Sequence, residues 1–266
     1  MNKYFLSEIK IYPFKSLGGM SLQSAEVEER GLRYDRRWML VDETNRFITQ
    51  RSYPQMALIK VEIKDSLLTV AHKQNRLTPL TIKPFPYDGE GIDVQIWKDN
   101  VTALKYNDDV NDWFTIAIGI KCALVYMPDT TKRKTNPDYA KDRIVSFADG
   151  YPFLIIGEES LEELNNRLVV PLPMNRFRPN LVFKGGNSFD EDNWKTLRIG
   201  SAQFKVVKPC SRCAVTTVNQ ETSERGKEPL TTLTQFRSNN GEVLFGQNMV
   251  SERTGVINVG DEIYLI

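Results

Sequence analysis

Short stretches that alternate apolar with polar residues, separated by turn-forming residues, recur along much of this chain. Residues 57–64 alternate in this way, so their polar side chains share one face of a predicted strand. Residues 37–41 and 46–49 flank a polar turn, residues 94–97 and 101–104 flank another, and each pair predicts a hairpin. Many short strands with turns between them restrict the chain to a β-sandwich or a β-barrel.

Two segments depart from this pattern and predict helices. Residues 110–118 carry apolar side chains at helical spacing, and Asn107 or Asp108 can cap their start. Residues 158–168 place three leucines on one face. Between them, residues 128–137 are polar, have a proline at each end and predict a long loop. This loop is either a solvated linker or a flap facing an anion.

The charge and composition exclude several kinds of partner. The chain has 266 residues and a formal net charge of +1, so no excess of positive charge is available to hold nucleic acid or an anionic membrane. No stretch approaches the ~18 apolar residues of a membrane-spanning helix. The first residues lack the apolar core of a secretion signal, because Ser7, Glu8 and Lys10 interrupt it. We therefore expect a cytoplasmic protein.

The scarcity of histidine and cysteine restricts the metal sites that the chain can build. It has one histidine, His72, and three cysteines, which excludes a three-histidine zinc site and a two-histidine iron site. An iron–sulfur cluster normally takes four cysteines. Three cysteines also argue against a disulfide scaffold and for a reducing compartment.

The most informative segment is residues 208–218, where a predicted strand leads into a pair of cysteines, Cys210 and Cys213. A redox dithiol is one interpretation, but thioredoxin-like pairs begin a helix in a βαβ unit, and the flanks here predict strands. Half of a zinc site is another, although it would need both Cys122 and His72. Two packed structural cysteines are the third.

Arg212 lies between these two cysteines and favours a fourth interpretation. A cation that faces a thiol favours its thiolate form, and a thiolate is the soft ligand that a transition metal prefers. The residues alone leave all four interpretations open.

Several motifs in one order make the chain resemble MOSC-domain proteins of the mitochondrial amidoxime-reducing component type and their bacterial relatives. The resemblance spans nearly the whole chain. It rests on residues 11–16 (IYPFKS), 34–38 (YDRRW), 147–149 (FAD), 175–180 (NRFRPN), 210–213 (CSRC), 216–218 (TTV), 226–230 (GKEPL), 244–247 (LFGQ) and 259–261 (VGD).

This resemblance implies a mainly β fold with a few helices, built from two β-barrel-like domains. Residues 1–120 would form the MOSC N-terminal barrel, and residues 121–266 the MOSC domain. It also implies a molybdenum cofactor, in which a pterin dithiolene holds the metal and one protein cysteine completes the coordination. In the family's motif that ligand is the second cysteine, here Cys213, which would be both the metal ligand and the catalytic centre.

The resemblance also implies which residues would bind the cofactor. Its phosphate needs cations and hydroxyl groups, which Lys15, Ser16 and Arg36 could supply. Without the motifs, the two cations would be interpreted as exposed surface charges, and Ser16 as a turn hydroxyl. Arg212 completes the predicted cofactor site beside Cys213.

Four further positions are predicted to contact the cofactor. Arg178 and Asn180 flank a proline and could bind the phosphate or pterin, or merely hold their own loop with hydrogen bonds. Asp149 could accept hydrogen bonds near the cofactor, or only cap a turn. Arg51 is a weaker candidate for the same site.

The implied activity is that of an oxidoreductase that reduces N-hydroxylated compounds such as hydroxylamines, amidoximes and N-hydroxylated base analogues. Some bacterial relatives carry a further ferredoxin-like domain, whereas this chain stops at Ile266. We therefore expect a separate electron donor: a ferredoxin, a flavodoxin, a cytochrome b5-like protein or a reductase. The family is also associated with N-reductive detoxification and with pyridoxal phosphate binding.

Two other functions stay open. The chain could be a non-catalytic module that carries the molybdenum cofactor or transfers sulfur from a cysteine. It could also be a zinc or dithiol protein. Substrate choice would depend on loops such as residues 130–136 and 220–226, which carry no predictable partner.

Overall fold

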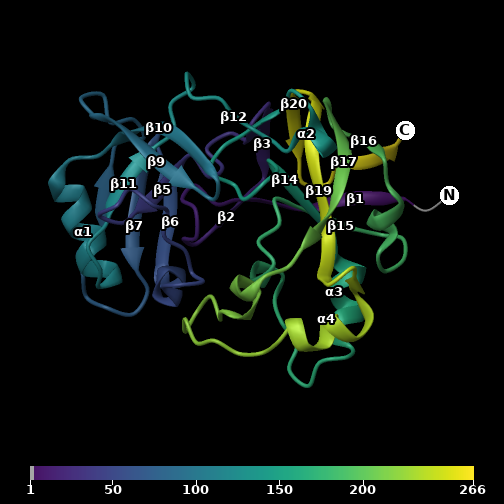
Figure 1. Cartoon of the computed structure of the whole chain (residues 1–266). Helices are drawn as coiled ribbons and strands as arrows, with labels where there is room; N and C mark the ends of the chain where they lie inside the picture. Colours follow the sequence, from purple (N-terminus) through teal and green to yellow (C-terminus); the bar gives the residue numbers. More distant parts are fainter. Residues whose placement is uncertain (1–2) are drawn as a thin grey trace.

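The computed structural model describes residues 3–266 and shows two lobes (Figure 1). In the C-terminal lobe, seven strands close a barrel, because each pairs with the next and the last pairs with the first. The first and second strands of this order run parallel, and all other neighbours run antiparallel. In order, the strands are β14 (Phe153–Gly157), β15 (Leu181–Lys184), β1 (Tyr4–Ile11), β21 (Glu262–Leu265), β16 (Thr196–Ile199), β17 (Ala202–Ser211) and β19 (Glu242–Arg253).

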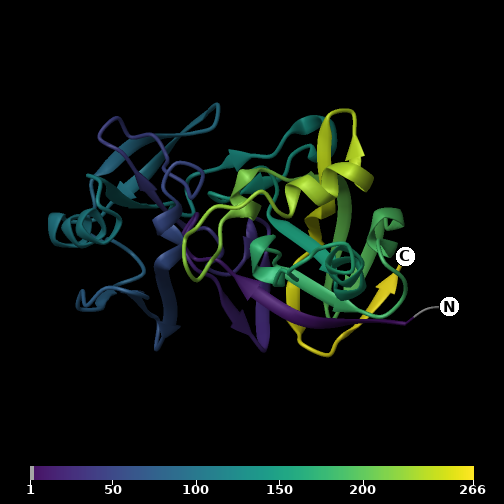
Figure 2. The same cartoon turned by 90° about the horizontal axis from the view of Figure 1, so that it is seen from below.

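The first strand of the chain thus belongs to the C-terminal barrel, along which it runs in Figure 2. Other early strands join the same lobe: β2 (Met20–Leu22) pairs with β1, while β3 (Ser24–Glu28) and β4 (Gly31–Leu32) form a sheet with β20 (Gly255–Asn258). Strands β1, β3 and β4 bury apolar side chains in the barrel's core, and β2 packs against this core. The lobes are therefore not two successive halves of the chain. A boundary between residues 120 and 121 stays a prediction.

The N-terminal lobe is an open half-barrel made of two sheets. One sheet has the order β5 (Trp38–Val41), β11 (Ala123–Tyr126), β10 (Asp99–Lys105), β9 (Gly91–Ile96), and the other β6 (Ile59–Lys64), β7 (Leu67–His72), β8 (Leu80–Ile82). The predicted fold class, mainly β with two barrel-like units, is confirmed, with one barrel closed and the other half-open. The predicted hairpin at residues 94–104 is β9 and β10.

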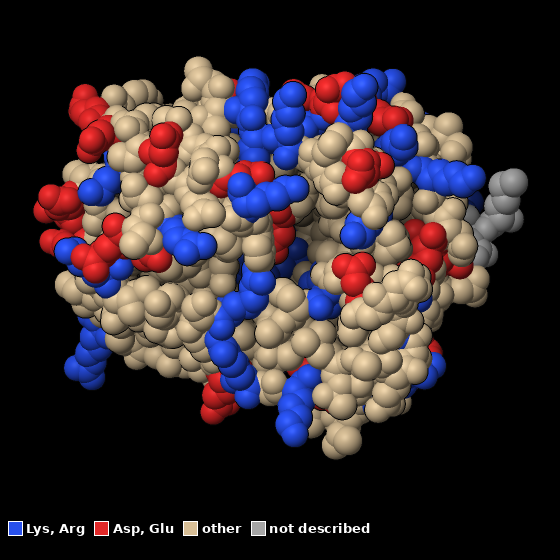
Figure 3. Space-filling view, viewed as in Figure 1, with Lys and Arg blue, Asp and Glu red and all other residues tan. Residues whose placement is uncertain are grey.

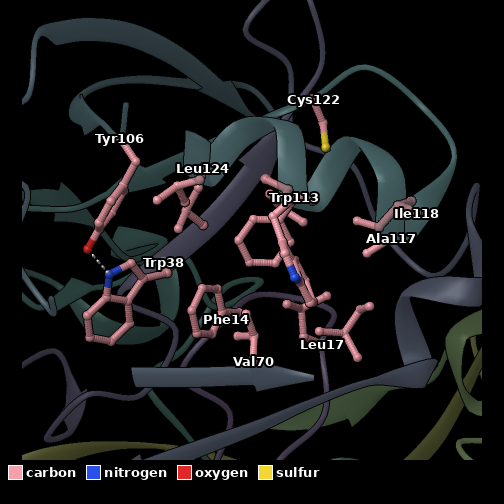
Figure 4. Close-up of a cluster of buried hydrophobic side chains, with 14 of the residues drawn as sticks. Phe14, Leu17, Trp38, Val70, Tyr106, Trp113, Ala117, Ile118, Cys122 and Leu124 are labelled. Atoms are coloured by element: carbon pink, nitrogen blue, oxygen red, sulfur yellow. Dashed lines mark hydrogen bonds between the residues drawn. The ribbon is translucent and has the colours of Figure 1, made fainter. Parts of the chain in front are cut away.

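Helix α1 (Asp108–Ile118) covers the N-terminal half-barrel and follows the predicted apolar stripe. Its first turn is capped by Asn107, whose side chain accepts a hydrogen bond from the backbone N–H of Val110. Figure 4 shows its buried face packed over Phe14 and Trp38. Each large apolar side chain buried here contributes roughly 1.5–3 kcal/mol.

The remaining elements are short and mostly connect the strands. They are η1 (Pro54–Leu58), β12 (Arg133–Lys134), α2 (Pro137–Ala140), β13 (Ile144–Val145), α3 (Glu158–Asn165), η2 (Met174–Arg176), η3 (Asp190–Asn193), η4 (Ala214–Thr217), α4 (Leu230–Phe236) and β18 (Ser238–Asn239). The second predicted helix is α3, which ends before Leu168.

The segment predicted as a long loop, residues 128–137, anchors a neighbouring segment through one buried side chain. Arg133 is 4% exposed and donates hydrogen bonds to three backbone carbonyls of residues 146–149, at 2.5–2.9 Å. Its Nε–H also donates to Asp99 Oδ2 at 2.8 Å. The segment is therefore not a fully solvated linker, because Arg133 ties the tip of the β9–β10 hairpin to residues 146–149. A flap facing an anion stays a prediction.

Candidate functional site

A cavity of about 280 Å³ is lined by residues from both lobes. Figure 3 shows a hollow near the middle of one face, with lysine and arginine side chains gathered around it. Seven cationic side chains and one carboxylate, Asp149, line the cavity. The cations are Lys15, Arg36, Arg51, Arg176, Arg178, Lys208 and Arg212. The cavity is thus strongly positive although the chain as a whole has a formal charge of only +1.

All nine residues predicted from the sequence as site residues line this cavity, although they lie far apart in the chain. They are Lys15, Ser16, Arg36, Arg51, Asp149, Arg178, Asn180, Arg212 and Cys213. The structure therefore brings the predicted set together at one place. What these residues bind stays a prediction.

Lys15 is a buried cation held at the wall of the cavity. Its side chain is 5% exposed, and its Nζ donates to the Phe147 carbonyl at 2.9 Å and to Asp149 Oδ1 at 2.5 Å. Burial lowers the pKa of Lys15 to about 8, although the Asp149 carboxylate acts in the opposite direction. Desolvation at the cavity wall would by itself raise the pKa of Asp149, but Lys15 and then Arg51 outweigh it and hold that pKa well below its usual range.

Two arginines of the cavity lie against the ring of one buried tyrosine. The guanidinium carbons of Arg36 and Arg178 are 4.5 Å and 4.1 Å from the centroid of the Tyr12 ring. Arg36 also forms an ion pair with buried Asp35 at 2.7 Å, while Arg178 donates to the Leu17 carbonyl. Burial lowers the pKa of Arg178 to about 10. The two cations are thus fixed in place before any ligand binds.

The backbone at the cavity is strained at three positions. Ser16, Arg36 and Arg178 have φ values of 66°, 48° and 56°, in the left-handed region that favours glycine. Each such residue costs on the order of 1–3 kcal/mol and persists only where its surroundings hold it. Strain of this kind concentrates at functional sites, so it supports the assignment of this cavity as the site.

The side chain of Asn180 forms hydrogen bonds with other groups of the protein. Its Oδ1 accepts from Arg36 Nη1 at 3.0 Å and from the backbone N–H of Leu154 at 3.3 Å. Its Nδ2 donates to the Lys10 carbonyl at 3.2 Å. These contacts support the alternative in which Asn180 holds its own loop and orients Arg36, and contact with a cofactor stays a prediction.

The cysteine segment enters the cavity where β17 ends. Arg212 faces Cys210 in this structure: its Nη1 donates to Cys210 Sγ at 2.9 Å, and its Nη2 donates to the Phe177 carbonyl at 2.5 Å. Cys213 directly precedes η4, and within residues 3–266 its sulfur has no hydrogen-bond partner. The guanidinium thus supports the first sulfur of the pair and leaves the second free for a ligand.

The third cysteine does not belong to this site. Cys122 is 5% exposed in the core of the N-terminal lobe, and burial raises its pKa to about 11. His72 ends β7, where its Nδ1 accepts two backbone N–H groups of the following turn. Across residues 3–266, no three His, Cys, Asp or Glu side chains cluster closely enough to hold a metal ion. A metal at Cys213 would therefore have to bring most of its own donor atoms.

Several lining residues were missed by reasoning from the sequence. They are Thr49, Tyr151, Arg176, Lys208 and Asn248. Two of them had a local signal, because Arg176 lies inside a quoted motif and Lys208 lies two residues before Cys210. Asn248 had none, because only the pairing of β17 with β19 places it opposite Lys208.

The chain matches two family models in tandem. Residues 4–121 match the MOSC N-terminal beta barrel domain, and residues 142–264 match the MOSC domain. The two matches follow each other along the chain, and the cysteine segment lies in the second. The chain is therefore of the class of MOSC proteins in which a MOSC N-terminal barrel precedes the MOSC domain.

Relatives of known name cover nearly the whole chain. Mitochondrial amidoxime-reducing component 1 of Mus musculus is 32% identical over 281 residues, which cover 98% of this chain and 82% of that protein. Molybdenum cofactor sulfurase of Arabidopsis thaliana is 33% identical over 287 residues, which cover 98% of this chain but only 35% of the sulfurase. The chain belongs to the family of MOSC-domain proteins that carry a MOSC N-terminal barrel, and the resemblance predicted from its motifs is confirmed.

Among solved structures, the YuaD protein of Bacillus subtilis aligns over 99% of this chain and 94% of its own, with 13% identity and a TM-score of 0.47. This likeness is too weak to carry functional information. Within residues 3–266, no helix is long and apolar enough to cross a membrane.

The cavity residues fit the molybdenum cofactor to which the family relates. The cofactor brings two dithiolene sulfurs and an anionic phosphate, so it needs one soft protein ligand and several cations. Cys213 can supply the soft ligand, and Lys15, Arg36 and Arg178 can supply the cations. Arg212 Nε is buried without a hydrogen-bond acceptor among the described residues. Such a group costs roughly 1–3 kcal/mol unless a ligand provides the acceptor.

Proposed function

We propose that this protein binds the molybdenum cofactor through Cys213 and reduces N-hydroxylated compounds with electrons from a separate donor. The observation that carries the proposal is that Lys15, Arg36 and Arg178 line the same cavity as the Cys213 thiol, which has no hydrogen-bond partner within residues 3–266. The similarity to an amidoxime-reducing component over 98% of the chain supports the type of reaction.

The residues of the cavity divide the binding of this cofactor between them. Lys15, Ser16, Arg36 and Arg178 would hold the phosphate, because they are buried or half-buried and fixed by the protein before binding. Cys213 would provide the thiolate ligand. Arg212, anchored on the Phe177 carbonyl, would donate its buried Nε–H to the bound group.

When bound, the molybdenum centre would supply the two-electron reduction of an N–OH group, which takes up two protons, breaks the N–O bond and releases water. The electrons would come from a small redox protein or a reductase: a ferredoxin, a flavodoxin or a cytochrome b5-like protein. Lys15 Nζ carries a proton at neutral pH, since its pKa is about 8, and keeps the wall of the cavity cationic during turnover.

Pyridoxal phosphate is not part of the proposal. A pyridoxal enzyme needs a lysine amine free to condense with an aldehyde, whereas both lysines of the cavity are ion-paired, Lys15 with Asp149 and Lys208 with Glu242. N-reductive detoxification and a cytoplasmic location stay predictions of the sequence.

A second candidate function is a module that carries the cofactor or transfers sulfur. It is favoured by the similarity to a plant molybdenum cofactor sulfurase, of which this chain spans about a third. Such a module would bind molybdenum and pterin without turning over N-hydroxylated substrates.

The test compares two single substitutions in a host that makes the cofactor. We expect Cys213→Ser to lose both molybdenum and the reduction of benzamidoxime with an artificial electron donor. Cys210→Ser is the matched control, since it removes the other sulfur of the pair, and we expect it to keep its molybdenum. Wild-type protein that lacks molybdenum would overturn the proposal, and one that holds molybdenum but reduces nothing would select the carrier function.

A further inference from the structure

Arg51 differs from every other cation of the cavity in how its charged group is used. Within residues 3–266, its guanidinium donates no hydrogen bond and has no carboxylate oxygen within 4.0 Å. The other six each have a protein partner for their charged group. Lys15 bonds Phe147, Arg36 bonds Asp35, Arg176 bonds Thr216, Arg178 bonds Leu17, Arg212 bonds Phe177, and Lys208 lies 3.8 Å from a Glu242 carboxylate oxygen.

The position of Arg51 is nevertheless fixed. Its guanidinium carbon lies 4.2 Å from the centroid of the Trp97 ring, a cation–π stack. Its backbone carbonyl accepts a hydrogen bond from the Arg225 side chain, which belongs to the C-terminal lobe. Arg51 is therefore oriented from both lobes, while its N–H donors bind no acceptor in the described part of the chain.

The tryptophan under Arg51 is itself anchored. Trp97 is at the tip of the β9–β10 hairpin with a φ of 55°, and its ring packs against Phe47 at 4.9 Å between centroids. Its Nε1–H donates to Asp149 Oδ1 at 3.3 Å. A strained hairpin tip thus holds the ring beside the wall of the cavity.

Arg51 is half-buried, and the side chains beside it are exposed to solvent. Trp97 is 38% exposed and the Asp149 side chain is 66% exposed, whereas Lys15 and Tyr12 are buried. The exposed ring of Trp97 thus places Arg51 beside solvent-facing groups. The buried cations are better placed to hold a resident cofactor.

We propose that Arg51, stacked on Trp97, binds an oxyanion of the substrate, so that the protein prefers N-hydroxylated compounds that also carry a carboxylate or phosphate. This inference rests on the proposed function of the same cavity. A guanidinium with free N–H donors binds a planar carboxylate or a phosphate in a bidentate manner. Its stacking on an indole leaves the edge of the guanidinium, where those donors lie, available to the ligand.

The test uses two substrates that differ only in an anion. Steady-state kinetics with 4-carboxybenzamidoxime and benzamidoxime would be measured for wild type, Arg51→Gln and Arg51→Lys. We expect Arg51→Gln to lower kcat/KM for the carboxylate by roughly 10–100-fold, the value of a charged hydrogen bond, and to change benzamidoxime less than about threefold. Arg51→Lys keeps the charge without the planar fork, and we expect it to recover only part of the loss.

Arg198→Gln is the matched control, because Arg198 also stacks on an aromatic ring, Tyr264, but does not line the cavity. We expect it to leave both substrates unchanged. A third substrate, 4-phosphonobenzamidoxime, replaces the carboxylate with a phosphate-like anion. We expect Arg51→Gln to lower its kcat/KM to the same extent.

A second readout does not depend on turnover. Trp97 is 38% exposed, whereas the other three tryptophans are at most 8% exposed. We expect 4-carboxybenzamidoxime, added without a reductant, to change the indole fluorescence of wild type but not of Arg51→Gln.

The outcomes separate this inference from the proposed function. Equal losses for both substrates, together with lost molybdenum, would make Arg51 a cofactor ligand and overturn the inference. Unchanged kinetics and fluorescence in Arg51→Gln would also overturn it. Molybdenum-loaded wild type that reduces neither substrate would instead overturn the proposed function.

Discussion

Removal of the Arg133 side chain tests whether the segment between the two family-model matches anchors the wall of the cavity. Arg133 is 4% exposed and donates to three carbonyls of residues 146–149 and to Asp99. In Arg133→Met, a side chain of similar length would fill the space without satisfying these acceptors. Residues 146–149 provide the Phe147 carbonyl and the Asp149 carboxylate to which Lys15 is bound.

The expected magnitude follows from these contacts. A buried acceptor left without its donor costs roughly 1–3 kcal/mol, and Arg133→Met removes the donor from three carbonyls, so we expect a loss of about 3–5 kcal/mol. In a chain of this size, each kcal/mol lowers the unfolding midpoint by roughly 2–4 °C. We therefore expect Arg133→Met to lower the midpoint by about 10 °C.

Thermal unfolding followed by circular dichroism measures this effect. Lys134→Met is the matched control, because Lys134 follows Arg133 on the same short strand, is exposed, and has no hydrogen-bond or ion-pair partner from its side chain within residues 3–266. We expect this control to shift the midpoint by less than about 2 °C, as surface substitutions do. Equal midpoints for the two variants would refute the idea that Arg133 anchors residues 146–149.

Two further predictions concern the cavity and the core. The affinity of the cofactor-free protein for sulfate, measured by calorimetry, should fall as the pH rises through about 8, because Lys15 loses its proton there. Lys15→Met should remove this pH dependence. A wild-type affinity that does not change with pH would contradict the prediction. Tyr106→Phe should lower the free energy of unfolding in urea by about 1–3 kcal/mol, since it leaves the buried indole N–H of Trp38 without its acceptor; an unchanged stability would count against that bond.

The sequence by itself determined most of the local structure. The helical spacing of apolar residues predicted α1, and Asn107 supplied its cap, because both signals lie within one continuous segment. The hairpin of β9 and β10 was predicted for the same reason. The cysteine segment was found because its residues are contiguous, and the order of the motifs indicated the family.

Only the tertiary structure decided which distant segments meet. The closure of the barrel depends on β1 pairing with β15 and β21, across more than half of the chain, and no local pattern encodes such a partner. The inward orientation of Arg133 could not be predicted either. A polar segment is expected to face solvent unless the carbonyls that accept hydrogen bonds from its side chains are known. Likewise, Arg212 reaches Cys210 and leaves Cys213 free because the end of β17 and the Phe177 carbonyl fix its side chain, which sequence spacing cannot express.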